Sequence, residues 1–134
     1  MSNKAVSFFT SIVLFSLLIV TGCGNPKVRG KVVFSDDQSP VSHGVVVFHG
    51  NGYIARGYIN NGEYAMESIK KNDGLPPGEY KISVKETQIK MGPENLPTFK
   101  NVIDKKYENP DTSGLTLNVT KSQNFDIQVD RVKE

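Results

Sequence analysis

Residues 78–85 read Gly-Glu-Tyr-Lys-Ile-Ser-Val-Lys, a stretch with the clear period of a β-strand. Apolar side chains stand at Tyr80, Ile82 and Val84, and polar side chains lie between them. Successive side chains of a strand point to opposite faces, so this alternation gives one apolar face and one polar face. The stretch therefore predicts a strand that is buried on one side and hydrated on the other.

The same alternation recurs before and after this stretch, and no segment shows a helical period. Strands are expected over 28–34, 43–49, 53–59, 63–66, 79–85, 115–120 and 124–129, with a weaker one over 100–107. Short strands at this spacing, separated by turn residues, are typical of a β-sandwich. The sequence predicts an all-β fold, an antiparallel Greek-key sandwich of seven to eight strands, preceded by a cleaved signal-peptide helix.

Turn residues indicate how neighbouring strands connect. Asn61-Gly62 predicts a two-residue hairpin, because a type I′ turn requires positive φ angles that these residues tolerate. Lys121-Ser122-Gln123 is expected to join the last two strands as a second hairpin. The segment 87–99 contains Gly92, Pro93 and Pro97 and is expected to be the longest irregular connection.

The N-terminal segment has the form of a bacterial lipoprotein signal. Lys4 precedes an apolar run, Ala5 to Val20, which is followed by Thr21, Gly22 and the single cysteine, Cys23. Sixteen residues are too short for a comfortable membrane span, which needs about 20, and suit a signal peptide. An uncleaved anchor is the alternative. We expect cleavage between Gly22 and Cys23, with a diacylglyceryl group and an amide-linked acyl chain such as palmitate on the cysteine, which together supply at least the two membrane signals that stable anchoring needs.

Processing at this site defines the rest of the chain. We expect a signal peptide at 1–22, an acylated tether at 23–27, one β-domain at 28–130 and a tail at 131–134. With Lys4 lost, the mature chain has 112 residues and a net charge of +1. No aspartate follows Cys23, so sorting favours the outer membrane, facing the periplasm or the surface. The charges are interspersed, so no basic face for nucleic acid is expected.

Several motifs in this order resemble the carboxypeptidase regulatory-like domain. They are Val28-x-Gly30-x-Val32, Gly44-x-Val46-x-Phe48, Asn61-Gly62-Glu63-Tyr64 and Leu75-Pro76-Pro77-Gly78-Glu79-Tyr80. The run from Lys106 to Thr116 is similar to that of small envelope lipoproteins of planctomycete-type bacteria. The resemblance covers about residues 28–129 and implies a transthyretin-like β-sandwich.

The resemblance implies no catalytic residues. In metallocarboxypeptidases that carry such a domain, the zinc chemistry lies in another domain. Transthyretin-like hydrolases of 5-hydroxyisourate end in Tyr-Arg-Gly-Ser, whereas this chain ends Asp130-Arg131-Val132-Lys133-Glu134. The implied protein is a binding or structural module rather than an enzyme.

The residues themselves also give little support to catalysis or metal binding. His43 and His49 have the same strand parity but are separated by ~20 Å of extended chain, too far to share a metal ion. Ser42 and His43 are neighbours, so on a strand they are expected to point to opposite faces and not to contact each other. No cofactor and no metal site are expected, and a hydrolase hidden in the loops is only a remote alternative.

Function is expected in the loops, because binding residues concentrate there on rigid scaffolds. The candidate binding loops are 68–78, 87–99 and 105–114, with Asp73, Tyr107 and Asp111 as candidate residues. Five tyrosines (Tyr53, Tyr58, Tyr64, Tyr80 and Tyr107) are expected to pack inward, the alternative being exposed rings that stack on sugars or on a partner.

These observations favour a lipid-anchored, non-enzymatic envelope module whose ligand the sequence does not identify. Its partners would be membrane lipid, through acylated Cys23, and an envelope protein or glycan. The rival hypothesis is an accessory lipoprotein subunit of a polysaccharide or secretion machine.

Overall fold

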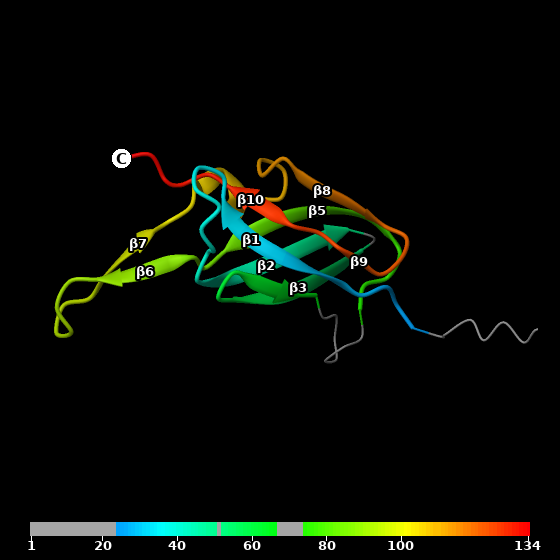
Figure 1. Cartoon of the computed structure of the whole chain (residues 1–134), viewed down its shortest axis with the longest axis horizontal. Helices are drawn as coiled ribbons and strands as arrows, with labels where there is room; N and C mark the ends of the chain where they lie inside the picture. Colours follow the sequence, from blue (N-terminus) through cyan, green and yellow to red (C-terminus); the bar gives the residue numbers. More distant parts are fainter. Residues whose placement is uncertain (1–23, 51, 67–73) are drawn as a thin grey trace, which may run out of the picture.

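The computed structural model describes residues 24–50, 52–66 and 74–134. Gly22, Cys23 and Asp73, and with them the predicted signal peptide, lie outside this part of the chain. The described strands are β1 (Val28–Phe34), β2 (His43–Gly50), β3 (Tyr53–Asn60), β4 (Glu63–Ala65), β5 (Gly78–Lys85), β6 (Gln88–Met91), β7 (Thr98–Asn101), β8 (Leu115–Val119), β9 (Gln123–Asn124) and β10 (Ile127–Val129). The all-β class predicted from the sequence is confirmed (Figure 1).

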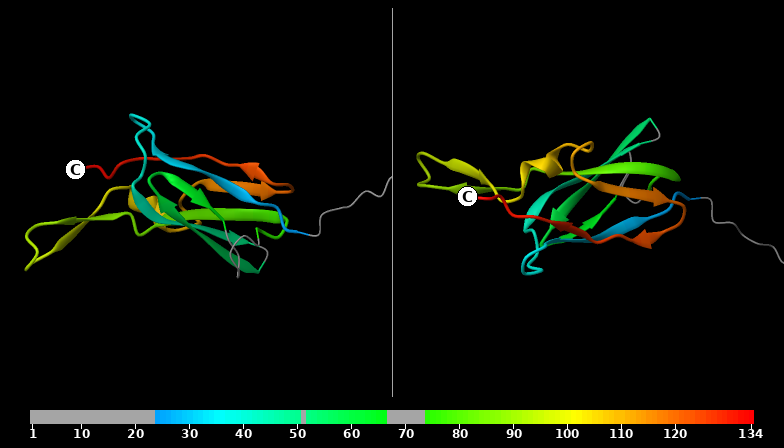
Figure 2. Two further views of the ribbon diagram at one scale, coloured as in Figure 1. Left: turned by 60° about the horizontal axis from the view of Figure 1, so that its bottom comes forward. Right: turned by 90° about the horizontal axis from the view of Figure 1, so that it is seen from above.

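Eight of these strands form one curled sheet in the order β10-β1-β4-β3-β2-β5-β8, with β9 also pairing with β1. The pairs β1-β4, β4-β3, β3-β2, β2-β5 and β5-β8 are antiparallel, but β9 and β10 run parallel to β1. The expectation of a purely antiparallel fold is therefore wrong, because the C-terminal strands pair with the first strand of the chain. A separate two-stranded sheet, β6-β7, extends from the body (Figures 1 and 2).

The predicted turn at Asn61-Gly62 is confirmed. Both residues have positive φ angles, 49° and 81°, and Asn60 pairs with Glu63 across the turn. Asparagine and glycine tolerate this left-handed backbone, so the sequence itself sets the register of the β3-β4 hairpin.

The centre of the sheet is buried on both faces. Val46 and Phe48 of β2 point into the core, where the Phe48 and Tyr80 rings lie 5.8 Å apart. On the outer face, Val45 and Val47 are only 5% and 4% exposed. Side chains of β3 and β5, among them Arg56 and Lys85, line the same surface hollow around them. The apolar residues of β2 therefore follow one another without alternation, as expected of a strand with little exposure on either face.

The two ends of the sheet meet around a short link. β8 pairs with β5 at one end and β9 pairs with β1 at the other, and only residues 120–122 connect β8 to β9. The hairpin predicted here is wrong. Because the link is short, the end of β8 and the start of β9 lie close together, yet β8 pairs with β5 and β9 pairs with β1. The sheet therefore curls around its core (Figure 2).

Gly30 allows the C-terminal segment to approach β1. A Cβ atom at this position would lie 2.0 Å from the backbone oxygen of Phe125. The Phe125 N–H donates to Arg29 O (2.8 Å), and the Lys31 N–H donates to the Asp126 carboxylate (2.9 Å). The Tyr64 hydroxyl donates to the Phe125 carbonyl (2.6 Å) from the strand opposite Gly30. Backbone and side chains together fix the step from β9 to β10.

The segment 87–99 differs from its prediction. It contains β6 and the start of β7, which pair from Gln88↔Asn101 to Met91↔Thr98, rather than an irregular connection. Gly92, Pro93 and Pro97 fall between the two strands, where they form the turn without removing hydrogen bonds from either strand.

The weak strand expected over 100–107 is also replaced. β7 ends at Asn101, and Lys105–Glu108 form a 3₁₀ helix, η1. The Asp104 carboxylate accepts from the Lys106 N–H at 3.0 Å and caps the first turn. The cap formed by the Asp104 side chain therefore favours a helical turn here over the strand that the weak alternation predicts.

Replacement of Gly30 by alanine is expected to destabilise the fold. Because the added Cβ would collide with backbone and not with a flexible side chain, we expect a loss of roughly 1–3 kcal/mol or more. Chemical denaturation measures the change. Gly24→Ala is the control, since no atom of the described residues lies within 4 Å of the added Cβ there. Equal stability of the two variants would contradict the role assigned to Gly30.

Candidate functional site

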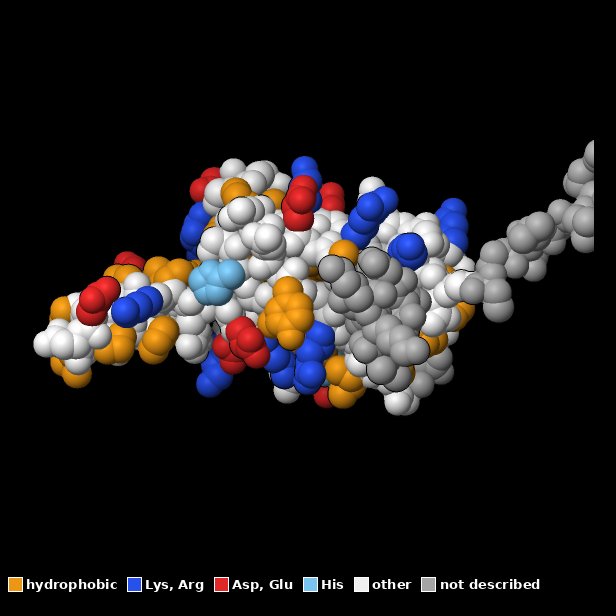
Figure 3. Space-filling model, turned by 90° about the horizontal axis from the view of Figure 1, so that it is seen from below, with side chains coloured by type: hydrophobic (Ala, Val, Ile, Leu, Met, Phe, Trp, Pro, Cys, Tyr) orange, Lys and Arg blue, Asp and Glu red, His pale blue; other side chains and the backbone are white. Residues whose placement is uncertain are grey.

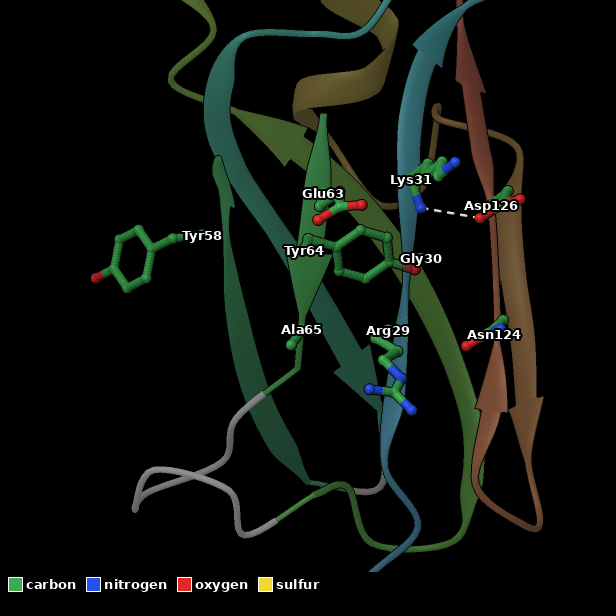
Figure 4. Close-up of a pocket in the computed structure, with 9 residues that line it drawn as sticks. All are labelled: Arg29, Gly30, Lys31, Tyr58, Glu63, Tyr64, Ala65, Asn124 and Asp126. Atoms are coloured by element: carbon green, nitrogen blue, oxygen red, sulfur yellow. Dashed lines mark hydrogen bonds between the residues drawn. The ribbon is translucent and has the colours of Figure 1, made fainter. Parts of the chain in front are cut away.

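The first candidate site is a hollow on the outer surface of β1 and β4, called here the β1–β4 hollow. It has a volume of about 650 Å³ and is lined by Arg29, Gly30, Lys31, Tyr58, Glu63, Tyr64, Ala65, Asn124 and Asp126. Figure 4 shows Tyr58 projecting from β3 on one side, with Asn124 and Asp126 on the far side.

The charges of the β1–β4 hollow are balanced. Arg29 and Lys31 supply two positive side chains, and Glu63 and Asp126 supply two negative ones. Asp126 is held in place by the Lys31 N–H, so one carboxylate of the hollow is already oriented. Among the described residues, the lining offers guanidinium, ammonium, amide, phenol and carboxylate groups, which can donate hydrogen bonds to a polar molecule and accept them from it.

A second hollow, the β2–β3 hollow, lies on the outer face of the sheet beside the first. It has a volume of about 510 Å³ and is lined by Val45, Val47, His49, Ile54, Arg56, Tyr58, Lys85 and Glu86. His49 Nε2 lies 3.1 Å from the buried Ser83 hydroxyl. Burial lowers the pKa of His49, and Lys85 and Arg56 lower it further, so its ring favours the neutral form.

Tyr58 lines both hollows. Its side chain is 73% exposed and has no hydrogen-bond partner among the described residues, unlike Tyr64 and Tyr80, whose hydroxyls donate to backbone carbonyls in the body. Tyr64, Tyr80 and Tyr107 are buried and Tyr53 packs against the core, as predicted. Tyr58 departs from the prediction. Tyr58 lies two residues after Arg56 in the same strand, so both side chains point to the same face. Because an arginine is expected to face the solvent, this spacing could have predicted that Tyr58 points outward.

The third candidate site is the β6–β7 hairpin, residues 88–101. Every residue from 88 to 100 is exposed, and Figure 3 shows hydrophobic side chains along its surface. The large ones are Ile89, Met91, Leu96 and Phe99, with Leu96 at 71% and Phe99 at 64% exposure. A two-stranded hairpin is marginally stable by itself, so an apolar hairpin on the surface is a candidate contact site.

Ser42 and His43 do contact each other, which corrects the prediction. Ser42 precedes β2, so strand geometry does not separate the two side chains, and its hydroxyl lies 3.0 Å from His43 Nδ1. His43 Nε2 donates to the Gln88 carbonyl at 2.6 Å. The imidazole therefore ties the beginning of β6 to β2, and it positions the hairpin.

The predicted loop 105–114 folds back onto the body. Tyr107 is buried, and its hydroxyl donates to the Asp130 carboxylate at 3.0 Å. Asp111 is exposed and forms an ion pair with Lys81 at 2.7 Å, which lowers the pKa of its carboxyl through a hydrogen bond. Both candidate residues hold the loop against the sheet. Neither lines a hollow, although the Asp111 carboxylate is close enough to His49, at the edge of the β2–β3 hollow, to interact with it electrostatically.

The predicted tail at 131–134 also contacts the body. The Arg131 guanidinium lies over the Phe34 ring, 3.7 Å from its centre, and pairs with Asp36 and Asp37. Glu134 forms an ion pair with Lys100 of β7 at 2.7 Å. The C-terminus thus braces both the first turn and the hairpin.

Comparisons with protein-family models, with curated proteins and with solved structures find no match to this chain. Within 24–50, 52–66 and 74–134, no three acidic, histidine or cysteine side chains gather as a metal site would require. In the same residues no helix is long and apolar enough to span a membrane.

Replacement of Asp130 by asparagine is expected to lower the melting temperature at pH 7. Asp130 accepts from Lys106, Ser35 and Tyr107, and these hydrogen bonds, that of Lys106 first, hold the pKa of its carboxyl far below the usual 3.8.

A depressed folded-state pKa gives stability that is present above the unfolded value and is lost as the pH falls toward the folded value. The difference between wild type and Asp130→Asn should therefore narrow below about pH 4, as measured by thermal melts across pH. If the difference in melting temperature between the wild type and Asp130→Asn stays constant down to pH 2, the charge of Asp130 does not have this stabilising role.

Proposed function

We propose that this protein is a non-enzymatic β-module of the bacterial envelope, anchored by lipid at Cys23, with a binding or structural role. The observation that carries the proposal is the signal sequence, in which an apolar run ends in Gly22-Cys23. Two acyl chains give the stable anchoring that one chain does not. The position at the outer membrane is part of the proposal, because no aspartate follows the cysteine.

The shape of the body supports this arrangement. β1 begins at Val28, five residues after Cys23. The described chain starts at one end of the long axis, and the β6–β7 hairpin extends at the other (Figure 1). An anchor at Cys23 would hold the body close to the membrane and direct the hairpin away from the bilayer.

The fold proposed within the all-β class is a Greek-key sandwich of the transthyretin-like, carboxypeptidase regulatory-like type. Its support is the order of the strand and turn motifs from Val28 to Val84, together with the curled sheet around one core. This class of domain supplies a rigid scaffold for binding surfaces and has no common catalytic residues.

Replacement of Cys23 by serine is expected to abolish acylation. Cys23 is the only cysteine, so no other side chain of this protein offers a sulfur to which a labelled lipid could be attached by a thioester or thioether bond. The measurement is palmitate labelling with intact-mass analysis of the protein in the membrane fraction. An unmodified wild-type chain that keeps Met1 would exclude the anchor, and Ser122→Ala serves as the control for an exposed hydroxyl.

A second candidate function is an accessory subunit of an envelope polysaccharide or secretion machine. The exposed hairpin favours it, because Ile89, Met91, Leu96 and Phe99 form a protein-binding type of surface at the end remote from the anchor. Both β6 and β7 pair only with each other among the described strands, so each offers an edge to a partner strand.

A photo-crosslinking residue at position 99 is expected to capture one specific envelope protein in intact cells, identified by mass spectrometry. The same residue at Thr116, exposed on β8, is the control and should capture none. Because Phe99 is exposed, the substitution should change stability by no more than about 0.5 kcal/mol. Equal capture at both positions would contradict a specific role of the hairpin.

A further inference from the structure

We propose that Tyr58 is the centre of a glycan-binding platform, formed by the β1–β4 hollow and the β2–β3 hollow together, whose ligand is an uncharged polysaccharide chain. The inference rests on the proposed binding role of the module. It assigns a ligand class to a surface distinct from the hairpin.

The first observation is the ring itself. Tyr58 projects from the outer face of β3 with most of its surface exposed. Among the described residues, no side-chain hydrogen bond, ring–ring contact or cation–π contact engages its ring. The four other tyrosines are all at least partly buried. A rigid aromatic face that the fold does not use is suited to stack on the apolar C–H face of a sugar ring, because it loses little entropy on binding.

The second observation is the position of the ring between two hollows. Arg29, Lys31, Glu63, Asn124 and Asp126 lie on one side of Tyr58, across β4 and β1. Ile54, Arg56 and Lys85 lie on the other side, above the buried Val45 and Val47. Figure 3 shows hydrophobic side chains over β3 separated by basic and acidic ones. An extended chain could therefore cross the sheet with one residue stacked on Tyr58 and its neighbours in the hollows.

The third observation is the balance of charge and of hydrogen-bonding groups. The two hollows contain four basic side chains (Arg29, Lys31, Arg56 and Lys85) and three acidic ones (Glu63, Glu86 and Asp126). None of these seven makes an ion pair with another described residue. Sugar hydroxyls both donate and accept, so they match a mixture of cations, carboxylates and an amide. The positive and negative side chains are interspersed and nearly cancel, so a polyanion would find no concentrated basic face here, which favours a neutral glycan.

The test uses the mature acylated protein in detergent. One arm is native electrophoresis through gels that contain hydroxyethyl cellulose, a soluble neutral polysaccharide, and the other is co-sedimentation with insoluble chitin, a neutral N-acetylated polysaccharide. The two arms distinguish a hydroxyl-rich from an N-acetylated glycan. Retention of the wild type in either arm is expected, and Tyr58→Ala should weaken it roughly tenfold, the effect of losing one stacked ring.

Two further variants make the test specific. Tyr58→Phe keeps the ring and should retain most of the binding, whereas Phe99→Ala removes an aromatic side chain of similar exposure on the hairpin and should bind like the wild type. Retention by neither glycan, equal retention of Tyr58→Ala and wild type, or retention only by a polyanion such as alginate and only at low salt would overturn the proposal. A chain without lipid would refute the anchor and leave this result unaffected, since glycan retention is measured in detergent.

Discussion

The close approach of Phe125 to Gly30 is the constraint on which the rest of the structure depends. It lets the C-terminal segment run parallel to β1, while the preceding strand, β8, pairs with β5 at the opposite end of the sheet. Since only three residues separate β8 from β9, both ends must come together, and the sheet curls around its core. Tyr64 strengthens this junction with its hydroxyl on the Phe125 carbonyl, and burial raises its pKa, so the phenol stays protonated and able to donate.

This closure separates the surfaces on which the functional proposals rest. The outer face from β1 to β2 carries the two hollows and Tyr58, and the hairpin extends from the far end of the long axis. Polar contacts hold the loops between these surfaces. Tyr107 and Lys106 contact the Asp130 carboxylate, and Arg131 forms ion pairs with Asp36 and Asp37. A platform on the sheet and an arm at its end could serve a glycan and a protein partner at the same time.

The hairpin and the last strands show why local patterns do not identify partners. Residues 88–91 and 98–101 alternate weakly, so their strand character came from pairing with each other and from the His43 bond to Gln88. Residues 115–129 alternate strongly, so the strands before and after the link at 120–122 were predictable. Their positions at opposite ends of the sheet were not predictable from this pattern. Tyr58 was predictable as outward-facing from its parity with Arg56, whereas the two hollows beside it required the positions of β1 and β4.

The sequence by itself determined the β class, most of the strand positions, the Asn61-Gly62 turn and the lipidation pattern at Cys23, because these depend on side-chain period, backbone tolerance and short motifs. Only the tertiary structure decided the parallel pairing with β1, the capped turn at Lys105–Glu108, the contact of Ser42 with His43 and the exposure of Tyr58 between two hollows. The parallel pairing and the surroundings of Tyr58 join residues far apart in the chain and arise only when the sheet has closed. The capped turn and the contact of Ser42 with His43 are local, but they depend on where the neighbouring strands end.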